Sequence, residues 1–187
     1  MNIERALATQ GFMAESELTY LAELAAKSKY IAEIGTWQGR SAIAIAENKQ
    51  KEGVLYCVDT WADNAYGSAP AEMTSSPNWL WNAFQKNIGD LLHNPIFPYR
   101  LNSVDGAAHF REEGCSFDMI FIDAGHNYED VIADIRAWKP LLASGGVLCG
   151  HDYAEYHPGV IRAVDELVPK FKVIGTIWTT EGMEEAK

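Results

Sequence analysis

Short runs of apolar residues alternate along this chain with longer segments whose apolar residues recur every three or four positions. Continuous apolar runs are typical of buried strands, and the longer spacing is typical of amphipathic helices. The pattern predicts strands at 30–36, 54–60, 99–103, 117–124, 145–153 and 172–180. It predicts helices at 1–28, 40–50, 79–92, 104–114, 127–144 and 159–171.

This alternation of strand and helix indicates an α/β fold. Strands that are linked by helical crossovers pair in parallel, so we expect a mostly parallel sheet of six or seven strands with helices on both faces. Residues 1–187 are predicted to form a single domain, since no repeat or linker divides them. Its parts are an N-terminal helical segment at 1–28, a substrate-side insertion at 62–82 and a charged tail at 181–187.

The predicted insertion is rich in Ala, Ser and Pro, and aromatic residues lie in it and beside it. Aromatic side chains at such a place either pack in the core or form a lid over a sugar or another ring-shaped substrate. Both interpretations stay open for four residues, which are Trp61, Tyr66, Trp79 and Trp81.

The formal net charge of −11 argues against a nucleic-acid partner, and no local cluster of basic residues offsets it. No apolar run approaches the length of a membrane span, and the N-terminus lacks the basic start and apolar middle of a signal peptide. We therefore expect a cytoplasmic protein that acts on a small molecule, either as a monomer or as a homo-oligomer. The three cysteines share no metal-ligand spacing, and two of them lie inside apolar strand-like runs, which predicts buried thiols in a reducing compartment.

Polar residues follow the predicted strands at the points where the strands end. They are Asp59, Ser103, Asp123, His151 and Asp152. Open α/β sheets bind ligands outside the carboxyl ends of their strands, so these side chains together predict one site. Each of them alone is also typical of a turn or of a helix cap.

The first predicted strand leads into the sequence EIGTWQGRS, residues 33–41. Gly35 and Gly39 permit a tight turn and a close approach of the backbone to a ligand. Asp59 ends the next strand, where a carboxylate accepts hydrogen bonds from a ribose. Because Trp37 interrupts the GxGxxG pattern that cradles a pyrophosphate, S-adenosylmethionine fits better than a dinucleotide.

Four segments together resemble a known family: EIGTWQGRS, CVDTW, FIDAGHNYEDVIADIRAWKPLLASGGVLCGHDY and GVIRAVDEL. They are similar to the class I S-adenosylmethionine-dependent methyltransferases, and most of all to the branch with macrocin O-methyltransferase and the cephalosporin hydroxylase-like proteins. The resemblance extends from about residue 30 to about residue 178. It implies a Rossmann-like methyltransferase fold, a methyl donor over the first two strands, and often a divalent cation such as Mg²⁺ held by acids after the fourth and fifth strands.

The resemblance also implies roles for individual residues. Gly35 and Gly39 match the donor-binding turn, Asp59 matches the ribose-binding acid, and Ser103 matches the position beside the adenine. With their neighbours, the implied donor contacts are Glu33, Gly35, Thr36, Gly39, Ser41, Asp59, Thr60, Trp61, Ser103 and Asp123.

Asp123 and Asp152 match two metal-binding aspartates of the family, and His126 matches the histidine proposed as its general base. His151 stands where some metal-binding relatives have a glutamate. Histidine can bind a metal but suits Mg²⁺ less well than a carboxylate does, so the metal set Asp123, Asp152 and His151 stays open.

The resemblance therefore predicts an enzyme that methylates a hydroxyl of a sugar or a secondary metabolite, with His126 and Asp123 as catalytic residues. One alternative is an NAD-linked oxidoreductase, although the chain lacks both GxGxxG and a Tyr-x-x-x-Lys pair. Another is a relative that kept the fold and lost the chemistry. For Asp123 and His126 themselves, the plain alternative is a turn residue followed by a loop histidine beside a helix cap.

Overall fold

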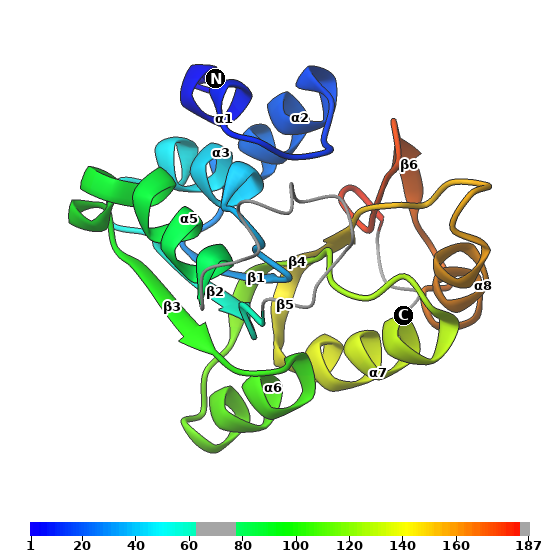
Figure 1. Cartoon of the computed structure of the whole chain (residues 1–187). Coiled ribbons are helices and arrows are strands. Elements are labelled where there is room, and N and C mark those ends of the chain that lie inside the picture. Colours follow the sequence, from blue (N-terminus) through cyan, green and yellow to red (C-terminus); the bar gives the residue numbers. More distant parts are fainter. Residues whose placement is uncertain (63–77, 184–187) are drawn as a thin grey trace.

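The computed structural model describes residues 1–62 and 78–183 of the chain. Its centre is a seven-stranded sheet with the order β3-β2-β1-β4-β5-β7-β6 (Figure 1). The strands are β1 (Tyr30–Ile34), β2 (Val54–Asp59), β3 (Ile96–Arg100), β4 (Phe117–Ile122), β5 (Leu142–Gly150), β6 (Lys172–Ile174) and β7 (Ile177–Thr179). Strands β1 to β5 run parallel, whereas β7 pairs antiparallel with both β5 and β6. The predicted fold class is confirmed.

Helices cover both faces of this sheet, as Figure 1 shows. One face carries α1 (Glu4–Ala8), α2 (Glu15–Ala25), α3 (Arg40–Asn48) and α5 (Trp79–Ile88), with the 3₁₀ helix η1 (Gly89–His93). The other carries α6 (Ser103–Glu112), α7 (Tyr128–Trp138), the 3₁₀ helix η2 (Lys139–Leu141) and α8 (Pro158–Leu167). None of the described helices is both long enough and apolar enough to cross a membrane.

The central strand β1 is buried on both faces because its side chains alternate between two apolar clusters. Ile31 belongs to the cluster under α2 and α3, whereas Ala32 and Ile34 belong to the cluster under α6 and α7. β1 pairs with β2 on one side and with β4 on the other, so the strand order reverses at this strand. Such a switch point brings the carboxyl ends of β1 and β4 together where open α/β sheets bind ligands.

Several elements differ from the prediction made from the sequence. The strand predicted at 99–103 is β3 at Ile96–Arg100, so Ser103 begins α6 instead of ending a strand, and residues 142–144 of the predicted helix belong to β5. The predicted helix at 1–28 is two helices, and in the segment between them Arg40 donates hydrogen bonds to the carbonyls of Thr9 (2.6 Å) and Met13 (3.0 Å). These bonds satisfy backbone oxygens that an unbroken helix would have paired internally. The predicted strand at 172–180 is the hairpin β6–β7, whose turn contains Gly175 at φ +63°.

The predicted insertion at 62–82 falls mostly on residues 63–77, which lie outside the described residues, and Tyr66 is one of these. Among the flanking aromatic residues, Trp61 and Trp79 are buried in the cluster under α3. The Trp61 ring lies 4.9 Å from that of Trp81 and 4.6 Å from that of Phe84, measured between ring centroids. These described tryptophans agree with core packing rather than with a lid.

The predicted C-terminal tail starts as part of the folded protein. Glu181 pairs with Lys27 at 3.1 Å and also with Lys172. Ion pairs therefore connect the first residue of the tail to the segment after α2 and to β6. Residues 184–187 lie outside the described residues.

Candidate active site

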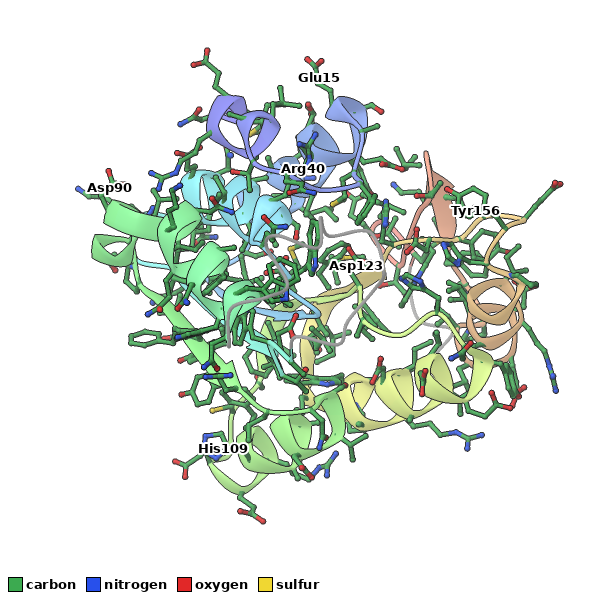
Figure 2. All side chains as sticks on the ribbon, viewed as in Figure 1. Glu15, Arg40, Asp90, His109, Asp123 and Tyr156 are labelled. Carbon is green, nitrogen blue, oxygen red and sulfur yellow. The ribbon has the colours of Figure 1, made fainter. Side chains whose placement is uncertain are left out.

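A cavity of about 1040 Å³ opens at the carboxyl ends of the parallel strands. Figure 2 shows Asp123 near the middle of this region, with Arg40 toward the N-terminal helices and Tyr156 toward α8. Most of the predicted site residues line the cavity, namely Gly35, Thr36, Ser41, Asp59, Thr60, Ser103, Asp123, His126, His151 and Asp152. Its volume is sufficient for a nucleoside ligand together with a second small molecule.

The turn after β1 requires glycine at its first position. Gly35 has φ +84°, and a Cβ atom there would lie 2.1 Å from the carbonyl oxygen of Asp123. The backbones of the β1 and β4 ends can therefore approach each other only without a side chain. Gly39 has φ +90° and precedes the first residue of α3. Trp37 lies between them at φ +48°, which is an uncommon conformation for a bulky residue.

The carboxylate of Asp59 holds this turn in place. Its Oδ2 accepts hydrogen bonds from the backbone N–H groups of Thr36 (2.9 Å) and Trp37 (2.8 Å). Its Oδ1 accepts one from the N–H of Trp61 (2.7 Å). A carboxylate has about four lone-pair positions, so a cavity-lining Asp59 can still accept a further hydrogen bond from a ligand. Asp59 can thus serve as both a turn residue and a ribose acceptor.

Three of the predicted donor contacts lie behind the cavity rather than in its lining. Glu33 is fully buried between β1 and β2, with the Cys57 thiol 3.7 Å from its carboxylate. Burial raises the pKa of Glu33 to about 8, so the carboxyl is neutral at pH 7. Trp61 is fully buried, and its indole N–H donates to the carbonyl of Trp37 (2.8 Å). Gly39 faces the side chain of Phe84. None of the three lines the cavity, and their predicted contact with the donor stays a prediction.

Ser103 begins α6 at the opposite side of the cavity from the N-terminal helices. The indole N–H of Trp138 contacts both its carbonyl oxygen (3.1 Å) and its Oγ (3.0 Å). Asn102 caps the same helix by accepting a hydrogen bond from the N–H of Asp105 (2.9 Å), and it also lines the cavity. This start of α6 is therefore rigidly held, as a contact surface for an adenine would need to be.

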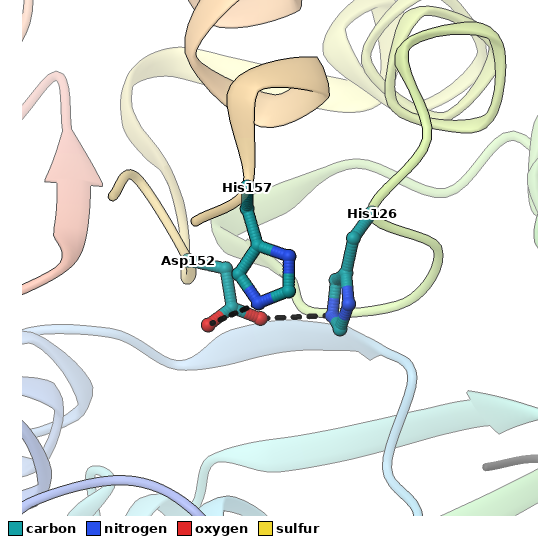
Figure 3. Close-up of side chains that lie close together, drawn as sticks. All are labelled: His126, Asp152 and His157. Carbon is teal, nitrogen blue, oxygen red and sulfur yellow. Dashed lines mark ion pairs between the residues drawn. The ribbon is translucent and has the colours of Figure 1, made fainter. Parts of the chain in front are cut away.

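A cluster of carboxylates and imidazoles forms the deeper part of the cavity. Nε2 of His126 lies 2.8 Å from Oδ2 of Asp152, and the rings of His126 and His157 are 4.3 Å apart (Figure 3). Nδ1 of His151 lies 3.2 Å from Oδ1 of Asp152 and 3.7 Å from Oδ1 of Asp123. Asp152 has φ +62°, a sparsely populated conformation that turns it toward all three histidines.

These contacts set the charges of the cluster. Burial raises the pKa of Asp123 to about 6, and the nearby charge of Asp152 acts in the same direction. The hydrogen bond to Asp152 raises the pKa of His126 above its ordinary value. Burial opposes the charged forms of Asp152 and His151. For Asp152, the hydrogen bonds with His126 and His151 outweigh burial, and for His151 the hydrogen bond with Asp152 and the charge of Asp123 outweigh it. The pKa of Asp152 is therefore lowered, and that of His151 is raised to about 9.

His157, beside Pro158, was open in the sequence between lining the site and starting the last helix, and it lines the cavity. Two other residues of this cluster were not predicted from the sequence. Glu17 of α2 and Thr176 of the β6–β7 turn both line the cavity. Oε1 of Glu17 accepts hydrogen bonds from the N–H (2.7 Å) and the hydroxyl (2.8 Å) of Thr176. In the sequence, the sign of such a role for Glu17 was its place on the apolar face of α2, one helical turn before Leu21. No comparable signal marked Thr176, because the hairpin itself was not predicted.

Aromatic residues also line the cavity at its rim, and these were missed as well. Phe12, in the segment between α1 and α2, is 75% exposed, and its ring lies 5.3 Å from that of Trp37. Tyr156, just before α8, is 70% exposed. Exposed rings at a cavity mouth can pack against a bound ring system.

Among the residues that the structure describes, two groups of side chains have a spacing compatible with a metal. The ligand atoms of Asp123, His151 and Asp152 lie within 4.8 Å of one another, and so do those of His126, Asp152 and His157. In the first group, Nδ1 of His151 faces both carboxylates, while its Nε2 contacts the hydroxyl oxygen of Thr176. The predicted cation at this group stays a prediction. The second group offers two imidazoles, a donor set that Mg²⁺ does not prefer.

Comparison with known proteins agrees with this geometry. A family model described as "Methyltransferase domain" matches residues 32–153, which is more than half of the chain. The chain belongs to this methyltransferase family. The matched span runs from β1 through the residues after β5, so it contains the glycine turn and, of the carboxylate–histidine cluster, Asp123, His126, His151 and Asp152. The match favours a methyltransferase over the oxidoreductase alternative.

One curated relative of this chain is "Uncharacterized protein R132" of Acanthamoeba polyphaga mimivirus, which is 25% identical over 159 residues. The alignment covers 76% of this chain and 65% of the viral protein, so the chain spans less than two thirds of that relative's length.

Solved methyltransferase structures share the fold. The O-methyltransferase from Bacillus cereus in complex with SAH has a TM-score of 0.67 at 17% identity, with 94% of this chain and 86% of that chain covered. TomG from Streptomyces achromogenes, an O-methyltransferase in complex with SAM, has a TM-score of 0.65 at 18% identity, covering 90% and 79%. CalS11, a TDP-rhamnose 3'-O-methyltransferase, has a TM-score of 0.63 at 14% identity, covering 89% and 77%. The predicted class I methyltransferase fold is thus confirmed.

Proposed function

We propose that this methyltransferase transfers the methyl group of S-adenosylmethionine to a hydroxyl of a small molecule, with His126 as the general base. One observation carries the proposal: a single cavity joins the glycine turn and Asp59 to the His126–Asp152 pair. Donor binding and proton acceptance would then occur in the same space. The acceptor class is a sugar or a secondary metabolite.

The lining of the cavity supports the donor. Gly35 keeps the backbone open beside the β4 end, and Asp59 can accept from a ribose hydroxyl. S-adenosylmethionine carries a positive sulfonium, and carboxylates of Asp59, Asp152 and Glu17 line the same cavity. An acidic cavity favours a cationic ligand over an anionic one such as a pyrophosphate. The B. cereus and TomG structures contain SAH and SAM, which supports the same donor for this chain.

The chemistry requires a base that is held in one orientation. During transfer, the acceptor oxygen forms a bond to the methyl carbon while the carbon–sulfur bond breaks, and its electron pair stays on sulfur. The hydroxyl proton must leave, and a positioned base is the group that receives it. Nε2 of His126 is hydrogen-bonded to Asp152, so Nδ1 is the atom assigned to accept this proton. A carboxylate that orients a catalytic imidazole is a recurring arrangement in enzymes.

The rim of the cavity supports a ring-shaped acceptor. The exposed rings of Phe12 and Tyr156 can pack against the apolar face of a sugar or an aromatic metabolite. CalS11 is described as acting on TDP-rhamnose, which makes sugars a sensible first class to test.

A tritium-transfer assay with methyl-labelled S-adenosylmethionine tests the proposal against a panel of glycosides, sugar nucleotides and hydroxylated metabolites. For an acceptor found in this way, His126→Ala should lower kcat by about 10²–10⁴-fold, the usual contribution of a general base. Binding of S-adenosylhomocysteine should change little. His109→Ala is the matched control, because His109 lies on α6 outside the cavity lining and its loss should leave kcat unchanged. A near-normal kcat for His126→Ala would reject His126 as the base.

A further inference from the structure

Two histidines and one aspartate converge in the deeper part of the cavity. Nε2 of His126 lies 2.8 Å from Oδ2 of Asp152, and Nε2 of His157 lies 3.8 Å from Oδ1 of the same carboxylate (Figure 3). The centroids of the two imidazole rings are 4.3 Å apart. One ligand atom from each of the three side chains lies within 4.8 Å of the others. The three side chains therefore share one small volume.

The backbone holds the two histidine-bearing segments together. A Cβ atom at Gly159 would lie 2.6 Å from the carbonyl oxygen of His126, so the start of α8 contacts the loop after β4 without an intervening side chain. The N–H of His157 donates to the carbonyl of Ala154 (2.8 Å), and the N–H of Ala154 donates to the carbonyl of Asp152 (2.8 Å). The fold thus sets the positions of the three side chains before a ligand binds, and such preorganisation favours metal binding.

The group is also accessible from the cavity. The side chains of His126 and His157 are 29% and 27% exposed, and that of Asp152 is 13% exposed. All three residues line the cavity. An ion can therefore enter from the cavity and keep a coordination position there for water or a ligand, as metal sites with three protein ligands do.

The donor set determines which metal fits. Imidazole suits Zn²⁺, Ni²⁺ and Cu²⁺, whereas Mg²⁺ prefers oxygen ligands. Because zinc lies about 2.0–2.2 Å from nitrogen and oxygen ligands, the ligand atoms of one ion lie within about 4.2 Å of one another, and small changes of side-chain torsion give this group that spacing. We propose that His126, Asp152 and His157 bind a late first-row transition-metal ion such as Zn²⁺. The site differs from the predicted Mg²⁺ set because it has two imidazoles and does not use Asp123.

A bound ion has a consequence for catalysis, and this consequence rests on the proposed function. Coordination uses the lone pair of Nε2 of His126, so the imidazole exchanges its hydrogen bond with Asp152 for a bond to the ion. The neutral imidazole then carries its proton on Nδ1 and has no lone pair left for the proton of the acceptor hydroxyl. Zn²⁺ at this site therefore inhibits methyl transfer.

Calorimetric titration of the full chain with Zn²⁺ near neutral pH tests the proposal without a methyl acceptor. The wild type should bind one Zn²⁺ with micromolar affinity, and excess Mg²⁺ should not displace it. His157→Gln should weaken binding at least tenfold, since even changes around a metal ligand cost about 10–100-fold in affinity. His109→Gln is the matched control, because it removes an imidazole of α6 outside the cavity lining and should change nothing. Asp123→Asn should still bind Zn²⁺ more tightly than His157→Gln does.

A second measurement needs no variant. Co²⁺ bound at this site should give a visible absorption spectrum that is more intense than that of aqueous Co²⁺, and added Zn²⁺ should remove it. Three results would overturn the proposal: no Zn²⁺ binding by the wild type, unchanged binding by folded His157→Gln, or a loss in Asp123→Asn as large as that in His157→Gln.

Inhibition is tested separately, with an acceptor found by the tritium-transfer assay. Zn²⁺ should inhibit the wild type, and His157→Gln should need about tenfold more Zn²⁺ for the same inhibition, in line with its weaker binding. Equal inhibition of both proteins would reject the consequence for catalysis. A wild type that binds Zn²⁺ but not S-adenosylhomocysteine would instead reject the proposed function and leave the metal site in place.

Discussion

Glu33→Gln tests whether Glu33 is a neutral, buried support of the donor turn. Burial raises the pKa of Glu33 from 4.5 to about 8 in the folded protein, whereas the unfolded chain ionises near 4.5. Between these pH values the folded state binds one proton more than the unfolded state, so the free energy of unfolding falls as pH rises. The full interval corresponds to about 5 kcal/mol, of which about 3 kcal/mol is expressed at pH 7. Glutamine does not titrate, so the free energy of unfolding of the variant lacks this decrease with pH.

Urea unfolding of both proteins from pH 5 to pH 8 measures the effect. Other titrating groups are shared by the two chains, so they cancel in the difference of their unfolding free energies. That difference should change by about 1.4 kcal/mol per pH unit in favour of Glu33→Gln, whatever the intrinsic cost of the substitution. Glu23→Gln, at an exposed position of α2, is the control and should give a constant difference. Parallel curves for Glu33→Gln would mean that Glu33 is ionised in the folded protein, and would refute the reasoning.

Two further predictions concern the donor turn and the base. Asp59→Ala should weaken S-adenosylhomocysteine binding at least tenfold in calorimetry, because it removes an acceptor worth about 1.5–3 kcal/mol per charged hydrogen bond. It also releases the backbone N–H groups of Thr36 and Trp37, which hold the donor turn. Unchanged affinity would mean that the adenosine binds elsewhere. The pKa of His126 is raised by Asp152 and its neutral form is the base, so kcat/KM should rise with pH through an apparent pKa above 6.5. Asp152→Asn should move that rise to lower pH while reducing the plateau, and an unmoved profile would exclude this pair as its origin.

The strand ends could be predicted because strand periodicity and topology act on short stretches of sequence. Continuous apolar runs located β1, β2, β4 and β5, and an open α/β sheet then brings the polar residues after them to one edge. Asp59, Asp123 and His151 meet at the cavity for this reason. The glycine turn could also be predicted, because Gly35 has a positive φ and lies against the backbone of Asp123, where a side chain would not fit.

The features that could not be predicted from the sequence depend on contacts between distant segments. Glu17 and His151 are 134 positions apart, and no local pattern relates them. The β6 and β7 strands have three residues each, too few for alternation to separate them from one longer strand. The resemblance implied Trp61 as a donor contact, and only the structure shows that its side chain is buried in the core beside Phe84.

The central claim is that the cavity binds S-adenosylmethionine through the turn after β1, and calorimetric titration of the wild type with S-adenosylhomocysteine tests it most directly. We expect one site per chain with a micromolar dissociation constant, equivalent to about −8 kcal/mol, and no heat of binding with NAD. Glu23→Gln should bind S-adenosylhomocysteine like the wild type, whereas Asp59→Ala should bind it at least tenfold more weakly. Binding of NAD without binding of S-adenosylhomocysteine would contradict the account.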